Sequence, residues 1–149
     1  MSEAQFVRVK YRLTEQVAQP GGMTAGLASE RAQRELAAYA GDAMKSLGAM
    51  ISRMEAMSRE QTASLDSVYE EASTILDIAG VFDKRMLCDA CYSLCELVDR
   101  QRTHQRQDWV AIVVHVNALR LLWSKDGQEP DSLKSVVDGL WTITDRLAP

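Results

Sequence analysis

Apolar residues recur every three or four positions through nearly the whole chain from Thr24 onward. This spacing places them on one side of an α-helix, and short polar links divide the pattern into separate helices. A chain of 149 residues is long enough to bury one core. We therefore predict an all-α fold, an antiparallel helical bundle of four to five helices with a long first helix and an extended N-terminal arm. The predicted helices cover residues 24–59, 62–79, 84–102, 108–124 and the stretch from Pro130 onward.

The pattern also predicts one apolar face on the first helix, and where the next helices end and begin. Gly80 follows the last periodic residue of the second helix, which predicts that this helix stops there. Asp83 is placed to cap the start of the third helix. The residues that share this face of the first helix are Ala32, Leu36, Ala40, Ala43, Leu47, Met50, Met54 and Met57.

The N-terminal segment differs in kind from the rest of the chain. The stretch FVRVKYRL, residues 6–13, alternates apolar and basic residues, which predicts an extended segment. A Pro-Gly-Gly turn follows it, so we divide the chain into an N-terminal arm, residues 1–23, and a helical bundle domain, residues 24–149. A lone extended segment either docks on a partner, or packs on its own bundle or is disordered. The candidate partner-binding residues are Val7, Arg8, Val9, Lys10, Tyr11, Arg12, Leu13, Pro20, Gly21 and Gly22.

All three cysteines lie in the predicted third helix. Cys88, Cys91 and Cys95 are three and seven positions apart, so they share one helix face with apolar neighbours. A zinc site needs four ligands, and the two histidines, His104 and His115, form no ligand pair at short spacing. A catalytic thiol needs a base nearby and partial exposure. We therefore predict buried thiols and no metal or other cofactor.

No motif for a catalytic site is found in the sequence. The glycine-rich loops that bind phosphate or dinucleotides and the nucleophile elbow are not present. His115 lies in the middle of the fourth predicted helix, in VAIVVHVNALRLLW, with Ile112 and Leu119 one turn away. A phosphoaccepting histidine must stand in water, so we predict instead a histidine at the edge of the core. We expect no enzymatic activity.

The net charge and the first residues of the chain limit which surfaces it is expected to bind and which compartment it is expected to occupy. The net charge of −4 argues against binding to nucleic acid or to an anionic membrane surface. No apolar run is long enough to insert into a membrane. The first residues do not resemble a secretory leader, and an odd number of cysteines fits a reducing compartment. We expect a cytoplasmic protein.

Two resemblances bear on function. The segment VYEEASTILDIAGVFDKRMLCDACYSLCELVD, residues 68–99, resembles in layout the central hairpin of histidine-phosphotransfer domains. On that layout the phosphoaccepting position falls on Ser73, and the following Lys and Gly positions fall on Leu76 and Asp77, so the resemblance implies the shape without the chemistry. YRLTEQVAQPGG, DIAGVF, YSLCELVD and VHVNALRLL resemble the CheE-type accessory proteins of chemotaxis gene clusters, which implies a cytoplasmic signalling helper.

Three hypotheses on function follow. The first is a noncatalytic accessory protein that binds a component of a chemotaxis or two-component pathway: a response regulator, a histidine kinase or a chemoreceptor-array component, with recruitment to receptor arrays. The second is an active phosphotransfer protein that uses His115 or His104. The third is a structural subunit that self-associates, as a homodimer for example, through its long first helix.

Overall fold

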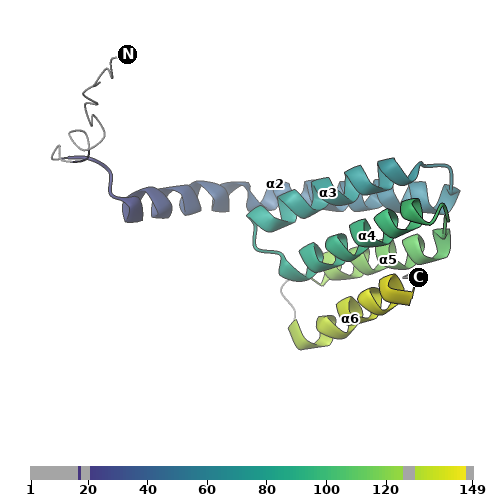
Figure 1. Ribbon diagram of the computed structural model, residues 1–149. Helices are drawn as coiled ribbons and strands as arrows, with labels where there is room; N and C mark the ends of the chain where they lie inside the picture. The colour runs from purple at the N-terminus through teal and green to yellow at the C-terminus, as the bar shows by residue number, and fades with distance from the viewer. Residues whose placement is uncertain (1–16, 18–20, 126–129, 147–149) are drawn as a thin grey trace, which may run out of the picture. The chain divides into compact units, whose positions relative to one another are not determined.

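The computed structural model describes residue 17, residues 21–125 and residues 130–146, with the backbone alone for residues 130–132. Every element in this part of the chain is a helix, as Figure 1 shows. The predicted all-α bundle with a long first helix is confirmed. The helices are α2 (Ala25–Glu60), α3 (Leu65–Val81), α4 (Arg85–Thr103), α5 (Trp109–Ser124) and α6 (Pro130–Arg146).

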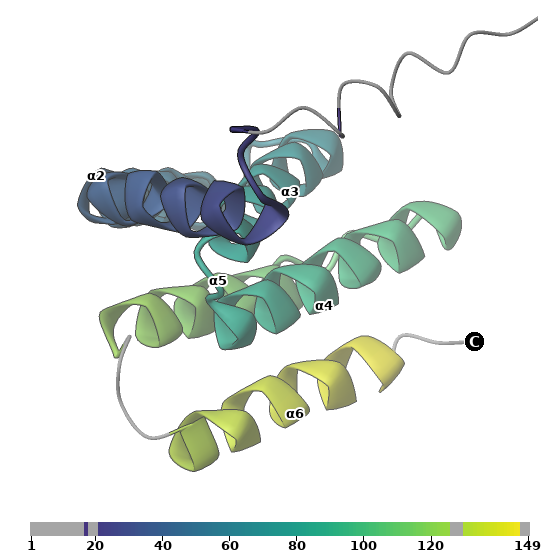
Figure 2. The same cartoon turned by 90° about the vertical axis from the view of Figure 1, so that its left-hand side faces the viewer.

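The chain divides into two compact units, residues 1–37 and residues 38–149. In the second unit the helices form three layers (Figures 1 and 2). The C-terminal part of α2 pairs with α3, α4 pairs with α5, and α6 packs on the other side of the α4–α5 layer. The chain reverses direction at each turn, so successive helices are antiparallel. This order places α4 and α5 between the other helices.

The core lies along the faces that these layers share. On the apolar face of α2, the positions from Leu47 to Met54 are buried or nearly so. Upstream on the same face, Ala32 is exposed and the side chain of Leu36 is 42% exposed. Periodicity predicts a helix face, but it does not say over what length other helices cover that face.

Short polar contacts fix where two of the helices begin. The hydroxyl oxygen of Ser64 accepts a hydrogen bond from the backbone N–H of Ser67 at 3.1 Å, at the start of α3. At the start of α5, a carboxylate oxygen of Asp108 accepts one from the N–H of Ala111 at 3.1 Å. Both side chains satisfy amide groups that the first turn of a helix leaves without a partner.

The turn between α3 and α4 corrects two predictions. Gly80 does not end α3, because the helix continues to Val81. Asp83 reverses the chain, with a φ of 54°, so it ends α3. It does not cap α4, because the first turn of α4 begins after Lys84 without a side-chain cap. The N–H of Lys84 bonds the carbonyl of Ala79 at 2.9 Å, as in the left-handed helix ends that usually contain glycine.

Two polar contacts hold α5 against α2. The indole N–H of Trp123 donates to the carbonyl oxygen of Met44 at 3.0 Å. The guanidinium group of Arg120 donates to both carboxylate oxygens of Glu55, at 2.9 and 2.7 Å. Such a two-pronged ion pair fixes geometry as well as adding energy. None of the helices described here is long and apolar enough to cross a lipid bilayer.

Candidate functional site

The cysteines lie on the face of α4 that packs into the bundle. Cys91 and Cys95 are buried, and Cys88 is half-buried. Burial raises the pKa of Cys95 to about 11 and that of Cys91 well above its usual value, so both are thiols at neutral pH. The predicted burial is therefore confirmed for two of the three. Among the residues with described positions, no cluster of three or more Cys, His, Asp or Glu side chains has the arrangement of a metal site.

His115 lies deeper than predicted. Its side chain is not at the edge of the core but fully buried. Its Nδ1–H donates to the carbonyl oxygen of Ala111, one turn earlier, at 2.9 Å. Nε2 is therefore the acceptor nitrogen, with the Ser93 hydroxyl at 3.1 Å and the Thr144 hydroxyl at 3.2 Å. Both ring nitrogens thus have partners inside the protein.

Ser93, His115 and Thr144 form a polar cluster that joins three helices. Ser93 comes from α4, His115 from α5 and Thr144 from α6, and all three are buried. The hydroxyls of Ser93 and Thr144 are 3.1 Å apart. Burial lowers the pKa of His115, so the ring is neutral. A closed network of this kind positions α6 on the central layer, and its burial keeps substrate away from the imidazole.

Sequence reasoning missed both hydroxyl partners of His115. Ser93 lies between Ala90 and Leu97 on the buried side of α4, so a serine within an apolar stripe was the available signal. Thr144 carried the same signal, because it follows Leu140 on the buried side of α6. Its contact with His115, 29 positions away in the sequence, is not a local property and could not be predicted. Arg100 strengthens the same junction, since its guanidinium donates to the carbonyl oxygen of Thr144 at 2.8 Å.

The segment that resembles a phosphotransfer hairpin corresponds to α3 and α4. Ser73 and Leu76 are half-buried on α3, and Asp77 is exposed. The sulfur of Cys88 lies 4.0 Å from the carbonyl oxygen of Leu76, so this side of α3 borders α4. The position that the resemblance assigns to a phosphoaccepting histidine therefore carries a partly exposed serine hydroxyl.

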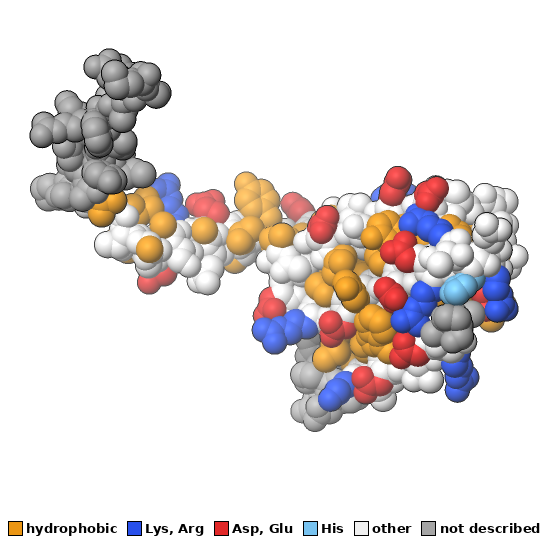
Figure 3. All heavy atoms as spheres, in the orientation of Figure 1, with side chains coloured by type: hydrophobic (Ala, Val, Ile, Leu, Met, Phe, Trp, Pro, Cys, Tyr) orange, Lys and Arg blue, Asp and Glu red, His pale blue; other side chains and the backbone are white. Residues whose placement is uncertain are grey.

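Figure 3 shows apolar side chains gathered among charged ones over α4 and α6. The same two helices carry an aromatic pair. The rings of Tyr92 and Trp141 lie with their centroids 5.9 Å apart, and Tyr92 is 58% exposed. Exposed aromatic side chains held by a neighbouring ring are typical anchors of protein–protein contacts. We call these two residues the Tyr92–Trp141 pair.

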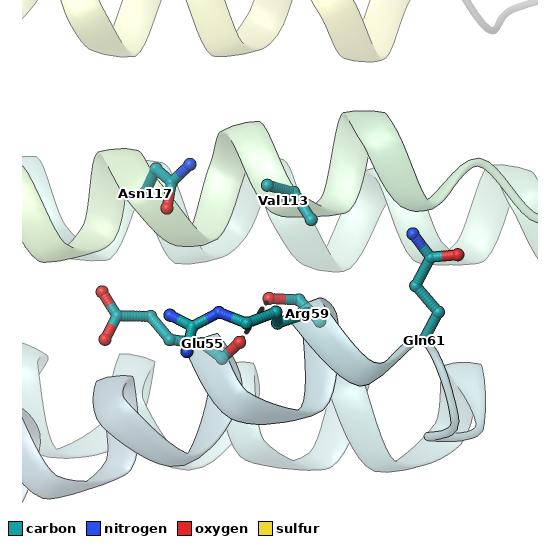
Figure 4. A pocket seen from close by; sticks show the side chains of 6 residues that line it. Glu55, Arg59, Gln61, Val113 and Asn117 are labelled. Carbon is teal, nitrogen blue, oxygen red and sulfur yellow. Dashed lines mark hydrogen bonds between the residues drawn. The ribbon is translucent and has the colours of Figure 1, made fainter.

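A shallow hollow lies between α2 and α5, shown in Figure 4. Its volume is about 360 Å³. Val113 and Asn117 of α5 face Glu55 and Arg59 of α2 across it (Figure 4). Because Arg120 pairs with Glu55 and lowers the pKa of that carboxyl group, the charge that remains at the hollow is the positive charge of Arg59.

The predicted partner-binding residues of the arm fall almost entirely outside the described residues: Val7, Arg8, Val9, Lys10, Tyr11, Arg12, Leu13 and Pro20. Gly21 and Gly22 are described and exposed. Gly21 has a φ of 97°, a conformation that favours glycine, so a turn does occur at this point of the chain.

Comparison with family models, with curated proteins and with solved structures found no match for this chain.

Proposed function

We propose that this chain is a noncatalytic signalling accessory protein that binds a component of a chemotaxis or two-component pathway. The partner is a response regulator, a histidine kinase or a chemoreceptor-array component, and the setting is the cytoplasm, with recruitment to receptor arrays. The resemblance of residues 68–99 to a phosphotransfer hairpin supports this class of partner. The observation that carries the proposal is the Tyr92–Trp141 pair on the surface of α4 and α6.

The Tyr92–Trp141 pair suits binding for a physical reason. Tyr92 exposes a large apolar ring with a polar hydroxyl, and its contact with Trp141 limits the freedom that binding must remove. Acidic and basic side chains surround the pair, among them Asp89, Glu96 and Arg100 on α4. An apolar centre with a charged rim is the usual composition of a specific protein contact.

Phosphate relay through His115 is the weaker candidate. Phosphorylation requires a ring nitrogen that a partner's aspartyl phosphate can reach, and both nitrogens of His115 are bonded inside the core. Ser73, at the corresponding position of the hairpin, has a hydroxyl group that does not carry phosphate reversibly in the way imidazole does. We therefore favour binding without transfer of phosphate.

The binding experiment compares two tyrosines of similar exposure. The full chain is immobilised, and purified receiver domains and histidine kinases of two-component systems are passed over it. Tyr92→Ala should weaken capture of the partner, whereas Tyr39→Ala should not, although Tyr39 is 63% exposed. Equal effects of the two substitutions would show that the partner does not bind at the Tyr92–Trp141 pair.

A labelling experiment separates binding from phosphate transfer. A receiver domain carrying a labelled phosphoryl group is incubated with the wild type, with His115→Gln and with His104→Gln. We expect no label on any of them. Label on the wild type that disappears in one histidine variant would replace the proposal by active phosphotransfer.

The N-terminal arm remains a predicted second contact. Arg8→Glu combined with Lys10→Glu should weaken capture in a salt-dependent way if the arm binds an acidic surface. Removal of residues 1–19 should leave the bundle folded, because the buried core begins at Leu47. A large fall in melting temperature on truncation would instead show that the arm belongs to the core.

A further inference from the structure

Helix α5 is apolar on all sides. Its sequence, WVAIVVHVNALRLLWS, contains one charged residue, Arg120. A helix of this composition is normally buried all round, yet three of its large aliphatic side chains are exposed in the structure. Val110 is 74% exposed, Val114 39% and Leu121 40%. α4 differs, because its exposed positions include the acidic residues Asp89 and Asp99.

Four of the exposed residues of α5 form one line along the helix. Val110, Val114, Asn117 and Leu121 are spaced by four, three and four positions, which places them on the same side. We call them the α5 stripe. Alternating steps of three and four are the spacing at which two helices pack along a seam. The hollow of Figure 4 adjoins the stripe, because Asn117 belongs to both and Val113 lines the hollow beside it.

We infer that a second copy of this chain covers the α5 stripe, with the two α5 helices antiparallel about a two-fold axis near Asn117. Asn117 is the polar residue within an aliphatic stripe. An amide group has both donors and an acceptor, so it bonds its own counterpart across a two-fold axis. Against a purely apolar partner the same amide would be buried without a hydrogen bond, which is unfavourable. A single asparagine in a helix seam fixes register in this way.

The charges near the α5 stripe also fit a second copy. A chain with a net charge of −4 repels its own copy, so a self-contact needs a surface without unpaired charge. Arg120 is the charged residue of α5, and Glu55 of the same copy neutralises it. An antiparallel arrangement about Asn117 places Leu121 of each copy opposite Val113 of the other, at the wall of the hollow. Leu121 of one copy and Val113 of the other then cover one another, and Val114 lies opposite Arg120, whose charge Glu55 of its own copy neutralises.

The first test measures self-association of the full chain by sedimentation equilibrium from micromolar to millimolar concentration. We expect a reversible dimer. Leu121→Glu and Val114→Glu should each raise the dissociation constant at least about tenfold, because they place a carboxylate in a closed apolar contact. Val81→Glu is the control, since Val81 is 58% exposed on α3 and should leave the constant unchanged. Circular dichroism checks that each variant keeps its helix content.

The second test locates the two-fold axis by cross-linking. Asn117→Cys, made together with Cys88→Ser to remove the half-buried thiol, should form a covalent dimer on mild oxidation because the axis brings the two copies of residue 117 together. Thr74→Cys, at an exposed position of α3, should not. A monomer throughout the concentration range overturns the inference. The inference is also overturned by a dimer that persists in both glutamate variants of the α5 stripe but dissociates in Leu36→Glu on α2.

Discussion

Gly48 of α2 lies against the indole ring of Trp123 of α5, so closely that a Cβ atom at residue 48 would be 2.6 Å from Cζ2 of Trp123. The ring has little freedom to move away. Its N–H is bonded to the carbonyl of Met44 at 3.0 Å, and the guanidinium of Arg120 lies 5.3 Å from the ring centroid. The absence of a side chain at Gly48 therefore sets how closely α2 and α5 approach.

We expect Gly48→Ala to lower the free energy of unfolding by about 1–3 kcal/mol, the usual cost of adding a methyl group to a packed core. Urea denaturation measures this change. Gly41→Ala is the matched control on the same helix, because nothing lies within 4 Å of a Cβ there. It should raise stability by about 0.5–1 kcal/mol, since alanine favours a helix more than glycine does. Equal effects of the two changes would show that Trp123 does not limit the packing.

The buried imidazole of His115 predicts a dependence of stability on pH. Burial lowers its pKa in the folded state below the usual 6.5, so the unfolded chain binds a proton more readily. The stability that the neutral imidazole contributes is fully present above about pH 6.5, and it is lost as the pH falls through the folded-state pKa of His115. The slope approaches about 1.4 kcal/mol per pH unit in that window.

Thermal melting from about pH 8 to about pH 5 checks this prediction. The chain has two histidines, so the assignment needs two variants. His115→Gln should melt earlier and lose the slope, whereas His104→Gln, at an exposed position, should keep it. A slope that survives in His115→Gln would assign the pH dependence to other groups.

The turn that follows α4 offers a stabilising substitution. Gln105 has a φ of 50°, in the left-handed region that costs most side chains about 1–2 kcal/mol. The N–H of the next residue, Arg106, bonds the carbonyl of Gln101 at 2.9 Å, so the helix end requires this conformation. Gln105→Gly should therefore raise the unfolding free energy by about 0.5–1 kcal/mol.

Chemical denaturation of Gln105→Gly and of Gln107→Gly separates this effect from a general effect of glycine. Gln107 is exposed in the same turn without a positive φ, so glycine there adds freedom to the unfolded chain and lowers stability. A loss of stability in both variants would mean that strain at Gln105 is small.

The three thiols should react in a fixed order. Cys88 is half-buried and should react first with a thiol reagent, whereas Cys91 and Cys95 should react only as the protein unfolds. The pKa of Cys95, about 11, further suppresses its thiolate at neutral pH. Mass spectrometry of partly labelled protein identifies the site, and Cys88→Ser should abolish the fast phase. Fast labelling of Cys91 in the folded protein would contradict its burial.

The sequence by itself determined the helices and the burial of part of α4. The spacing of apolar residues from Leu65 to Val81 and from Arg85 to Thr103 is a local property, and it correctly predicts that Cys91 and Cys95 face the core. It fails at Gly80, because the ending of α3 depends on a hydrogen bond between Lys84 and Ala79 rather than on glycine.

Only the tertiary structure decided which predicted helix faces are buried by other helices and which polar groups form hydrogen bonds with one another. Leu36 and Leu47 follow the same spacing on α2, yet Leu36 is 42% exposed and Leu47 is fully buried. His115 finds its hydroxyl partners on α4 and α6, at Ser93 and Thr144. The physical reason is that periodicity depends on neighbours three or four positions away, whereas cover and hydrogen bonding depend on residues that are distant in sequence and come together only when the helices pack.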